Sequence, residues 1–244
     1  MRGASCETSY SKAANSSSKD SDYDVTVVAG DSSFPQGPHL VLVQGVSAIN
    51  ESTAAGQFVQ ATVRVPVRNG ILELRVGGSA GFTLINSLDA VQVAGAPKPL
   101  ISMNFQPASS LVPEGYKQDS GALFDPIRGF GWTSSVPAVE RGRQVPQARD
   151  TFVYSAPLRT WNMDLPNGAY QVWVTVGDAA FTQGPQRVLV EGISLVNGET
   201  TAAGVFLEKT AMVQVMDGNL TMEMGGAGGI TILDQLVVAA APAP

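Results

Sequence analysis

The sequence predicts an all-β protein built from two tandem jelly-roll β-sandwich modules, the first of them incomplete. Its composition of 26 Gly and 15 Pro among 244 residues favours frequent turns over long helices. Short stretches alternate between apolar and polar residues, and a segment that begins near residue 23 recurs near residue 170. These three observations carry the prediction of fold class.

Alternation with a period of two residues predicts half-buried strands. It occurs in Tyr23–Val27, Leu72–Val76, Tyr170–Val176 and Leu220–Met224. Asn69-Gly70 and Asp217-Gly218 precede two of these stretches and are typical of tight hairpin turns. Because the predicted strands are short and separated by turns, they indicate a sandwich or jelly roll rather than a parallel sheet.

The repeat fixes the order of these strands. Gly30-Asp31 and the residues up to Pro38 match the segment from Gly177-Asp178 to Pro185, at an offset of 147 (178 − 31). After one inserted residue, Thr53-Ala-Ala-Gly56 matches Thr201-Ala-Ala-Gly204, and the match continues to the end of both copies. A single insertion over so long an alignment indicates two copies of one structural unit.

The two copies differ in what precedes them. Residues 97–169 precede Tyr170 and contain further strand-like sequence, whereas the residues before Tyr23 are mostly polar. We therefore predict a disordered or extended tail at 1–21, an incomplete module at 22–96, a complete module at 97–240 and a linker-like end at 241–244. An incomplete sandwich exposes unpaired strand edges, which another chain could cover.

Composition excludes several classes of function. The net charge of −6 and the pI of about 4.7 argue against nucleic acid as a partner. One Cys and one His exclude an internal disulfide framework and a Cys/His zinc site. The chain contains no run of 18 apolar residues, so the sequence predicts no membrane-spanning segment.

Candidate ligand-binding residues lie in the second module. Trp132 and Tyr116 follow Gly-rich or Pro-rich sequence that is typical of exposed loops. Asp178 and Phe181 are candidates in a predicted loop whose equivalent in the first module contains Phe34. This loop offers either a repeated contact or a repeated hydrophobic plug. Arg149 could donate to sugar hydroxyls or could pair with Asp150 on the surface.

The second module also carries a series of motifs in a characteristic order. They are Ile101-Ser-Met-Asn104-Phe105-Gln106-Pro107, Gly115-Tyr116, Gly129-Phe-Gly131-Trp132, Asp150-Thr-Phe152, Leu165-Pro-Asn-Gly168-Ala-Tyr170, Val176-Gly-Asp178, Thr201-Ala-Ala-Gly204, Asp217-Gly218-Asn-Leu220 and Ile230-Thr-Ile-Leu-Asp-Gln-Leu-Val237. This order resembles the malectin-like, galactose-binding-like β-sandwich, a carbohydrate-binding type of domain that also forms the front domain of rhamnogalacturonan acetylesterases. The resemblance covers residues 98–238, and residues 22–95 match only its latter half.

The resemblance implies a non-catalytic, sugar-binding domain that is extracellular or at the cell surface. By position, Trp132, Tyr154 and Phe181 are the closest counterparts of the aromatic residues that grip the sugar in malectin. The carboxylate of that site would fall in Gly225–Gly229, where this chain has none. Related modules sometimes hold a structural Ca²⁺, but no ligand cluster is visible in the sequence, so we predict no metal and no cofactor.

The leading hypothesis is thus a non-catalytic module pair for carbohydrate binding or surface adhesion, with a polysaccharide or glycan as partner. A second hypothesis is a structural subunit whose incomplete first module is completed by a neighbouring chain through its strand edges. A third is a glycan-active hydrolase that uses a carboxylate pair, for which Asp119 and Asp150 are candidates.

Overall fold

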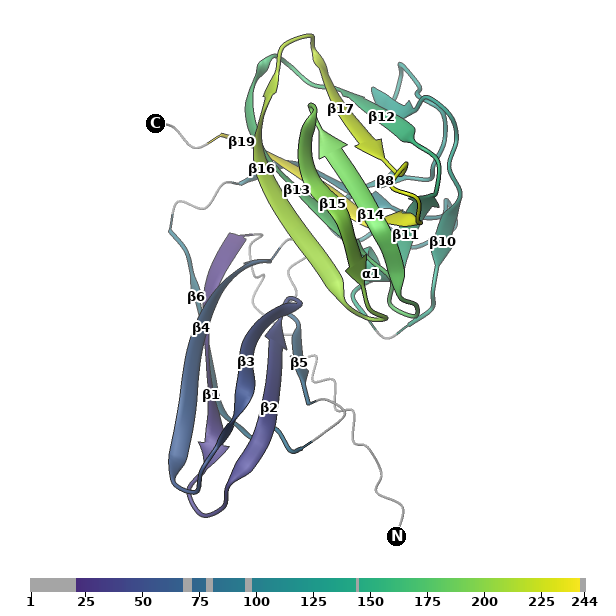
Figure 1. Ribbon diagram of the computed structural model, residues 1–244. Helices are drawn as coiled ribbons and strands as arrows, with labels where there is room; N and C mark the ends of the chain where they lie inside the picture. The colour runs from purple at the N-terminus through teal and green to yellow at the C-terminus, as the bar shows by residue number, and fades with distance from the viewer. Residues whose placement is uncertain (1–20, 68–71, 78–80, 95–97, 144, 242–244) are drawn as a thin grey trace. The chain divides into compact units, whose positions relative to one another are not determined.

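The computed structural model describes residues 21–67, 72–77, 81–94, 98–143 and 145–241. The predicted tail therefore lies outside the described residues except for Ser21, and so does the linker-like end from residue 242. By its internal contacts the chain divides into two compact units, unit 1 (Met1–Ala96) and unit 2 (Pro97–Pro244). Nearly all the regular structure in both units is β-strand, which confirms the all-β prediction (Figure 1).

Unit 1 is a small sandwich of two three-stranded antiparallel sheets, ordered β4-β1-β6 and β3-β2-β5. Its strands are β1 (Ser21–Asp31), β2 (Gln36–Val43), β3 (Val46–Thr53), β4 (Gln57–Val67), β5 (Leu74–Val76) and β6 (Ile85–Gln92). Alternate residues of β1 and β2 point between the sheets, so Val25, Val27, Val41 and Val43 form a fully buried core.

Unit 2 is larger because further strands extend the same arrangement on one side. Two five-stranded sheets, β16-β13-β19-β7-β8 and β15-β14-β17-β12-β9, enclose its core, and a three-stranded sheet β10-β11-β18 lies beside them. The strands are β7 (Pro99–Phe105), β8 (Lys117–Asp119), β9 (Phe130–Trp132), β10 (Ala138–Glu140), β11 (Thr151–Ser155), β12 (Arg159–Asp164), β13 (Gly168–Gly177), β14 (Gln183–Val190), β15 (Ile193–Thr201), β16 (Phe206–Val215), β17 (Asn219–Met224), β18 (Thr231–Leu233) and β19 (Gln235–Ala240). The single helix among the described residues is the short α1 (Gln147–Asp150).

The core of unit 2 is rich in aromatic residues. The Phe105 ring lies edge-on to both Trp132 and Trp161, at centroid distances of 6.0 and 5.8 Å. Edge-to-face pairs of this kind add to the stability that burial of the rings provides. The aromatic cluster comes from β7, β9 and β12, three strands for which unit 1 has no equivalent among its described residues.

Strands β1–β4 and β13–β16 pair in the same register. Val25 lies opposite Val63 in unit 1, and the equivalent Val172 lies opposite Ala211 in unit 2. The bulge that follows Gln36 in β2 recurs after Gln183 in β14. The sequence repeat therefore corresponds to a shared set of paired strands with shared irregularities.

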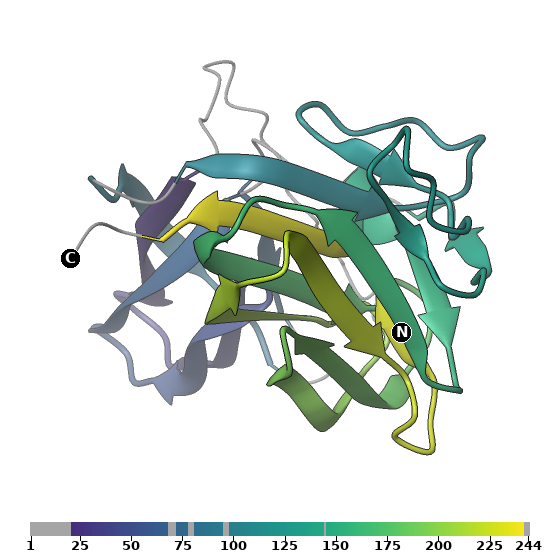
Figure 2. The same cartoon turned by 90° about the horizontal axis from the view of Figure 1, so that it is seen from above.

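The two units differ at one side of this shared set. In unit 2, β19 pairs with β7 and β17 pairs with β12, which extends both sheets (Figure 2). In unit 1 the equivalents of β19 and β17 are β6 and β5, and no other described strand pairs with their second edges. Unit 1 thus lacks the strands that close the sandwich in unit 2, within the described part of the chain.

Candidate functional site

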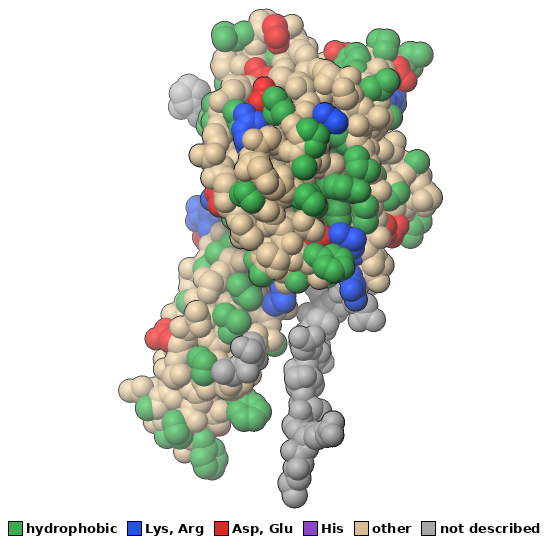
Figure 3. Space-filling model, turned by 45° about the vertical axis from the view of Figure 1, so that its right-hand side comes forward, with side chains coloured by type: hydrophobic (Ala, Val, Ile, Leu, Met, Phe, Trp, Pro, Cys, Tyr) green, Lys and Arg blue, Asp and Glu red, His purple; other side chains and the backbone are tan. Residues whose placement is uncertain are grey.

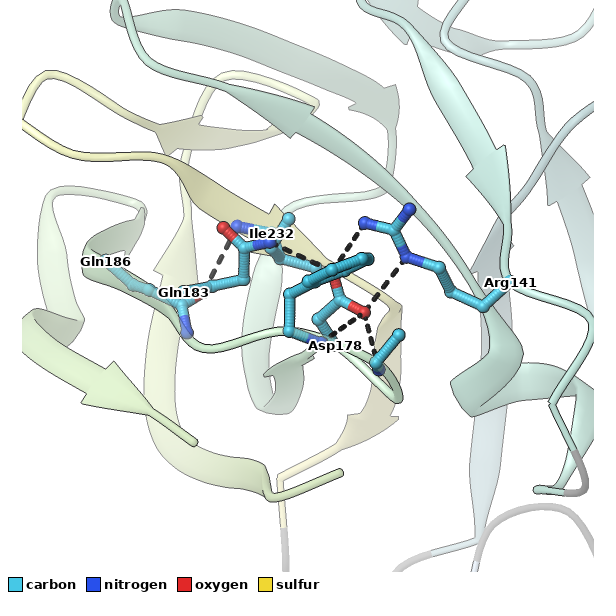
Figure 4. A network of polar contacts seen from close by, with 7 residues as sticks. Arg141, Asp178, Gln183, Gln186 and Ile232 are labelled. Atoms are coloured by element: carbon cyan, nitrogen blue, oxygen red, sulfur yellow. Dashed lines mark hydrogen bonds and ion pairs between the residues drawn. The ribbon is translucent and has the colours of Figure 1, made fainter. Parts of the chain in front are cut away.

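Asp178 organises the turn between β13 and β14. Its carboxylate accepts hydrogen bonds from the backbone N–H of Ala180 at 2.8 Å, from that of Phe181 at 3.3 Å and from Nε2 of Gln183 at 2.9 Å (Figure 4). An aspartate that bonds to the backbone two residues ahead is a common way to fix a tight turn. Here the turn holds the ring of Phe181 outward, with 55% of the residue exposed.

Arg141 joins this turn to the segment after β10. Its Nε donates to Oδ1 of Asp178 at 3.0 Å and its Nη2 donates to Oδ2 at 2.6 Å. The guanidinium carbon also lies 4.8 Å from the centroid of the Phe181 ring and 4.9 Å from that of Phe152. A bidentate ion pair combined with cation–π contacts on two rings holds the arginine in one position.

Hydrogen bonding decides the ionisation of Asp178. Burial alone would raise the pKa of this carboxyl, but the bonds from Arg141, Ala180 and Gln183 outweigh burial and hold the pKa below its ordinary value. Asp178 is therefore ionised at neutral pH, and the ion pair with Arg141 persists over the physiological range.

The outer face of the small sheet continues this surface. Val153 of β11 points into the core, so its neighbours Phe152 and Tyr154 lie on the opposite face, where their rings meet edge-on at 6.4 Å. Phe152 is covered, whereas Tyr154 is half-buried. We call Arg141, Phe152, Tyr154 and Phe181 the arginine–aromatic platform.

The platform lies on a surface that combines apolar and cationic groups. Figure 3 brings the side of unit 2 that carries β10 and β11 forward, and hydrophobic side chains gather there beside lysine or arginine side chains. The second arginine of this segment, Arg143, is exposed. An exposed aromatic ring next to fixed N–H donors suits a ligand that has both apolar faces and hydroxyl groups.

The buried side-chain amide of Gln186 fixes the strand next to the platform. Nε2 of Gln186 donates to Oγ1 of Thr201 at 2.9 Å, and Oε1 of Gln186 accepts from the backbone N–H of Ile232 at 3.1 Å. Figure 4 shows Gln186 and Ile232 on the other side of Asp178 from Arg141. Since Ile232 lies opposite Tyr154 in the β11–β18 pair, these bonds fix the position of the strand beside the platform.

The expectation that Trp132 lies in an exposed loop is wrong. Trp132 ends strand β9 and is only 1% exposed. Its Nε1 donates to Oδ1 of Asp119 at 3.0 Å, and Trp161 donates to the other oxygen at 2.7 Å. Burial raises the pKa of Asp119, although these two indole bonds act in the opposite direction. Trp132 is thus a core residue and presents no free face to a ligand.

Tyr116 and Arg149 are also buried. The hydroxyl of Tyr116 donates to Oε1 of Gln235 at 2.8 Å, which ties the loop before β8 to β19. The guanidinium carbon of Arg149 lies 5.4 Å from the centroid of the Phe206 ring. Of the six residues predicted from sequence, the structure brings Asp178 and Phe181 together, leaves Tyr154 half-buried on β11 and places Trp132, Tyr116 and Arg149 in the interior.

Unit 1 has the turn but not the arginine. Asp31 accepts from the backbone N–H groups of Ser33 at 2.7 Å and Phe34 at 3.2 Å, and Phe34 is 64% exposed. No described arginine pairs with Asp31, because Arg141 belongs to the segment of unit 2 that has no counterpart in unit 1. Phe34 therefore provides a natural comparison for Phe181.

Among the described residues, no group of three or more His, Cys, Asp or Glu side chains is placed to hold a metal ion. No helix in the described part of the chain is long and apolar enough to cross a membrane.

Comparison with known proteins gives one sequence match and several weak structural ones. No family model matches the chain. It is 30% identical over 105 residues to beta-agarase A of Zobellia galactanivorans, which covers 41% of this chain and 19% of the agarase. The chain thus matches only about a fifth of that enzyme's length.

Among solved structures, the protein YxiM of Bacillus subtilis is 26% identical with a TM-score of 0.47, over 58% of this chain and 40% of that one. The ANX2 ectodomain of Arabidopsis thaliana is 11% identical with a TM-score of 0.40, over 90% and 78%. The beta-glucuronidase of Bacteroides uniformis is 12% identical with a TM-score of 0.42, over 89% and 27%. All three TM-scores are below 0.5, so the assignment of a β-sandwich rests on the strand pairing described above.

Proposed function

We propose that unit 2 is a non-catalytic, malectin-like carbohydrate-binding module that binds a polysaccharide at the arginine–aromatic platform. The observation that carries this proposal is the exposed Phe181 ring, held in place by Asp178 and Arg141. Sugar rings have apolar C–H faces that pack on aromatic side chains, and their hydroxyl oxygens accept hydrogen bonds from N–H groups.

Arg141 can serve a ligand without giving up its structural role. Its Nε and Nη2 are used by Asp178, and its Nη1 donates to no described residue. The side chain is 24% exposed, so the remaining N–H groups can reach a hydroxyl of a sugar that lies on Phe181. A fixed donor beside an exposed ring loses little conformational entropy when a ligand binds.

The environment of the carboxylates supports a binding role rather than hydrolysis. Asp119 is enclosed by two indole N–H groups, and Asp150 accepts from the backbone N–H groups of Gly142 and Arg143 at 2.8 Å each. Asp178 is occupied by Arg141. Each of these carboxylates has a structural function, whereas a glycosidase needs two that face the substrate.

The agarase match indicates a class of ligand to test first. Since 105 residues of this chain resemble part of an enzyme named for agar, we propose a polysaccharide of the agar type as ligand and an extracellular or surface location, where such polymers occur. A match of this kind is expected if the matched part of the agarase is an accessory module of that enzyme.

The test is binding of the full chain to a panel of soluble polysaccharides that includes agarose, by affinity electrophoresis and calorimetry. We expect Phe181→Ala to weaken binding about tenfold, which corresponds to about 1.4 kcal/mol. Phe34→Ala, the same change in the equivalent turn of unit 1, is the matched control and should leave the affinity unchanged.

Three results would contradict the proposal. They are no binding to any polysaccharide in the panel, equal affinity of wild type and Phe181→Ala, and release of reducing ends from a bound polysaccharide by the purified chain. The last result would favour the hydrolase hypothesis.

A further inference from the structure

One edge of strand β6 in unit 1 pairs with no described strand. The backbone N–H of Val93 donates to the carbonyl of Asp22 at 2.8 Å, which sets the alternation of the β1–β6 ladder. Because antiparallel bonds recur at every second residue, Val91 and Asp89 direct their N–H groups toward β1. Leu88, Ala90 and Gln92 therefore direct theirs away from β1, where no described strand pairs with them.

Unit 2 shows what the same edge looks like when it is covered. Leu236 and Val238 of β19, the equivalents of Leu88 and Ala90, lie opposite Met103 and Ile101 of β7. Leu236 is fully buried there, whereas Leu88 is 39% exposed. The side chain of Ala239 is fully buried, whereas that of its equivalent Val91 is 65% exposed. Leu88, Ala90 and Val91 thus remain apolar in unit 1, although no described strand covers the edge.

The free edge also lacks the features that normally discourage pairing. Native edge strands often carry lysine, proline or inward-pointing charges. On the opposite side of the same sheet, β4 has Arg64 and Pro66. The sequence of β6 has no Lys, Arg or Pro, and its only charged residue is Asp89. The edge is thus chemically suited to accept another antiparallel strand.

We propose that a second copy of this chain occupies the edge, with β6 pairing antiparallel to β6 of the second copy. The edge is self-complementary, since each copy offers the same outward N–H and C=O groups and the same apolar residues. A twofold axis perpendicular to the sheet joins two such edges, which is the commonest symmetry of protein dimers. The β4-β1-β6 sheet then continues across the axis as six strands.

Charge selects the register of this pairing. With Asp89 opposite Asp89 of the second copy, two carboxylates would face each other directly, which is destabilising. The axis therefore passes beside Leu88 or Ala90, so that apolar residues lie opposite each other at the centre. Asp89 then lies opposite Ser87 or Val91 of the second copy.

The experiment is light scattering coupled to size-exclusion chromatography on the full chain, over a concentration series. A reducing agent is present throughout, so that Cys6 cannot form an intermolecular disulfide. The expected result is a mass of twice the 25.4 kDa of the chain at high concentration. Ala90→Pro removes an outward N–H without touching a bond to β1, and it should return the mass to that of one chain.

Controls separate pairing from folding. Ala90→Thr keeps the N–H and should remain dimeric, and circular dichroism should show that both variants are folded. If Ala90→Pro lowers the folded fraction, Gln92→Pro at the end of the strand carries the same test. A wild-type chain that stays monomeric at the highest concentration, or a dimer that Ala90→Pro and Gln92→Pro leave intact, would overturn the proposal. A monomer that instead binds a synthetic peptide of residues 98–106 would show that a β7-like strand is the partner, which also overturns it.

Discussion

Units 1 and 2 share six paired strand segments, yet the same residue types have different environments in the two. In unit 2 the segment from β7 to β12 extends both sheets, adds an aromatic core and supplies Arg141. In unit 1 the equivalent strands keep their register, and β6 and β5 are edge strands among the described residues. The strand pairing of the repeat is therefore set by the repeat's own sequence, while burial and the candidate binding site depend on the segment from β7 to β12, which we call the added segment.

The largest effect is expected at Asp119, which exists only in the added segment. Asp119→Ala leaves the indole N–H groups of Trp132 and Trp161 and the backbone N–H of Gly121 without their acceptor. Each unsatisfied buried donor costs about 1–3 kcal/mol, so we expect unit 2 to lose about 4 kcal/mol of unfolding free energy. Urea unfolding followed by tryptophan fluorescence reports this unit, because all three tryptophans lie in it.

Asp119→Asn is the matched variant, since it keeps one acceptor oxygen, and it should lose about half as much. An unfolding midpoint of Asp119→Ala equal to that of wild type would contradict the view that this carboxylate holds the added segment to the core.

The next effect compares two equivalent leucines. Leu236→Ala removes a fully buried side chain and should cost about 3 kcal/mol, within the range for buried leucines. Leu88→Ala acts on a side chain that is 39% exposed and should cost about 1 kcal/mol. Chemical denaturation of the two variants, with unit 1 followed by hydrogen exchange of β1 amides, gives both values. Equal losses would mean that β6 is covered in solution even in the monomer.

Substitutions of His39 test whether its buried hydrogen bonds are equivalent to those of Gln186 in unit 2. Its Nε2 lies 2.9 Å from Oγ1 of Thr53, and its Nδ1 accepts from the backbone N–H of Leu84 at 3.4 Å. Gln186 makes the same two contacts in unit 2. We expect His39→Gln to change stability by less than about 0.5 kcal/mol, whereas His39→Leu leaves two polar groups unpaired and should cost about 2 kcal/mol. The outcome that would count against this equivalence is a loss for His39→Gln as large as that for His39→Leu.

Asp234 gives a smaller effect that depends on pH. It is fully buried, neither of its carboxylate oxygens has a hydrogen-bond partner among the described residues, and its equivalent in unit 1 is Asn86. Burial raises the pKa of Asp234 well above its ordinary value, despite the opposing charge of Arg149. The folded state therefore keeps a proton that the unfolded state has released, so stability falls as pH rises above about 4 toward the raised pKa.

Asp234→Asn should remove this dependence. At pH 4 the variant and wild type should be similar, and at pH 8 the variant should be more stable by at least about 1 kcal/mol, since each unit of pKa difference is worth about 1.4 kcal/mol. Thermal unfolding at a series of pH values measures the difference. A stability gap that does not change with pH would show that the pKa of Asp234 is the same in the folded and unfolded states.

The strands were predictable from sequence because alternation reports burial directly. Val172, Val174 and Val176 recur at every second residue of β13, and all three lie in the core of unit 2. The repeat also indicated that Phe34 and Phe181 occupy equivalent turns, and both rings are exposed in the structure. Local sequence determined these features, so no knowledge of distant contacts was needed.

The prediction of an exposed loop at Trp132 is wrong because the glycines before it serve close packing of the backbone. A Cβ at Gly131 would lie 2.6 Å from the carbonyl oxygen of Leu123, so the glycine allows a close backbone approach beside β9 rather than a mobile loop. Arg141 and Asp178 are 37 residues apart, and their pairing follows from how the added segment lies against the repeat. No periodicity in the sequence encodes that contact.

Hydrogen exchange of the backbone amides in β6 and β19 tests the central comparison most directly. In a dilute sample, where the chain is monomeric, the N–H groups of Leu88 and Ala90 should exchange rapidly, while those of Leu236 and Val238 should be strongly protected. Raising the protein concentration should protect Leu88 and Ala90 and leave β19 unchanged. Protection of Leu88 and Ala90 equal to that of β19 at the lowest concentration would contradict the account, because the edge of unit 1 would then be covered within a single chain.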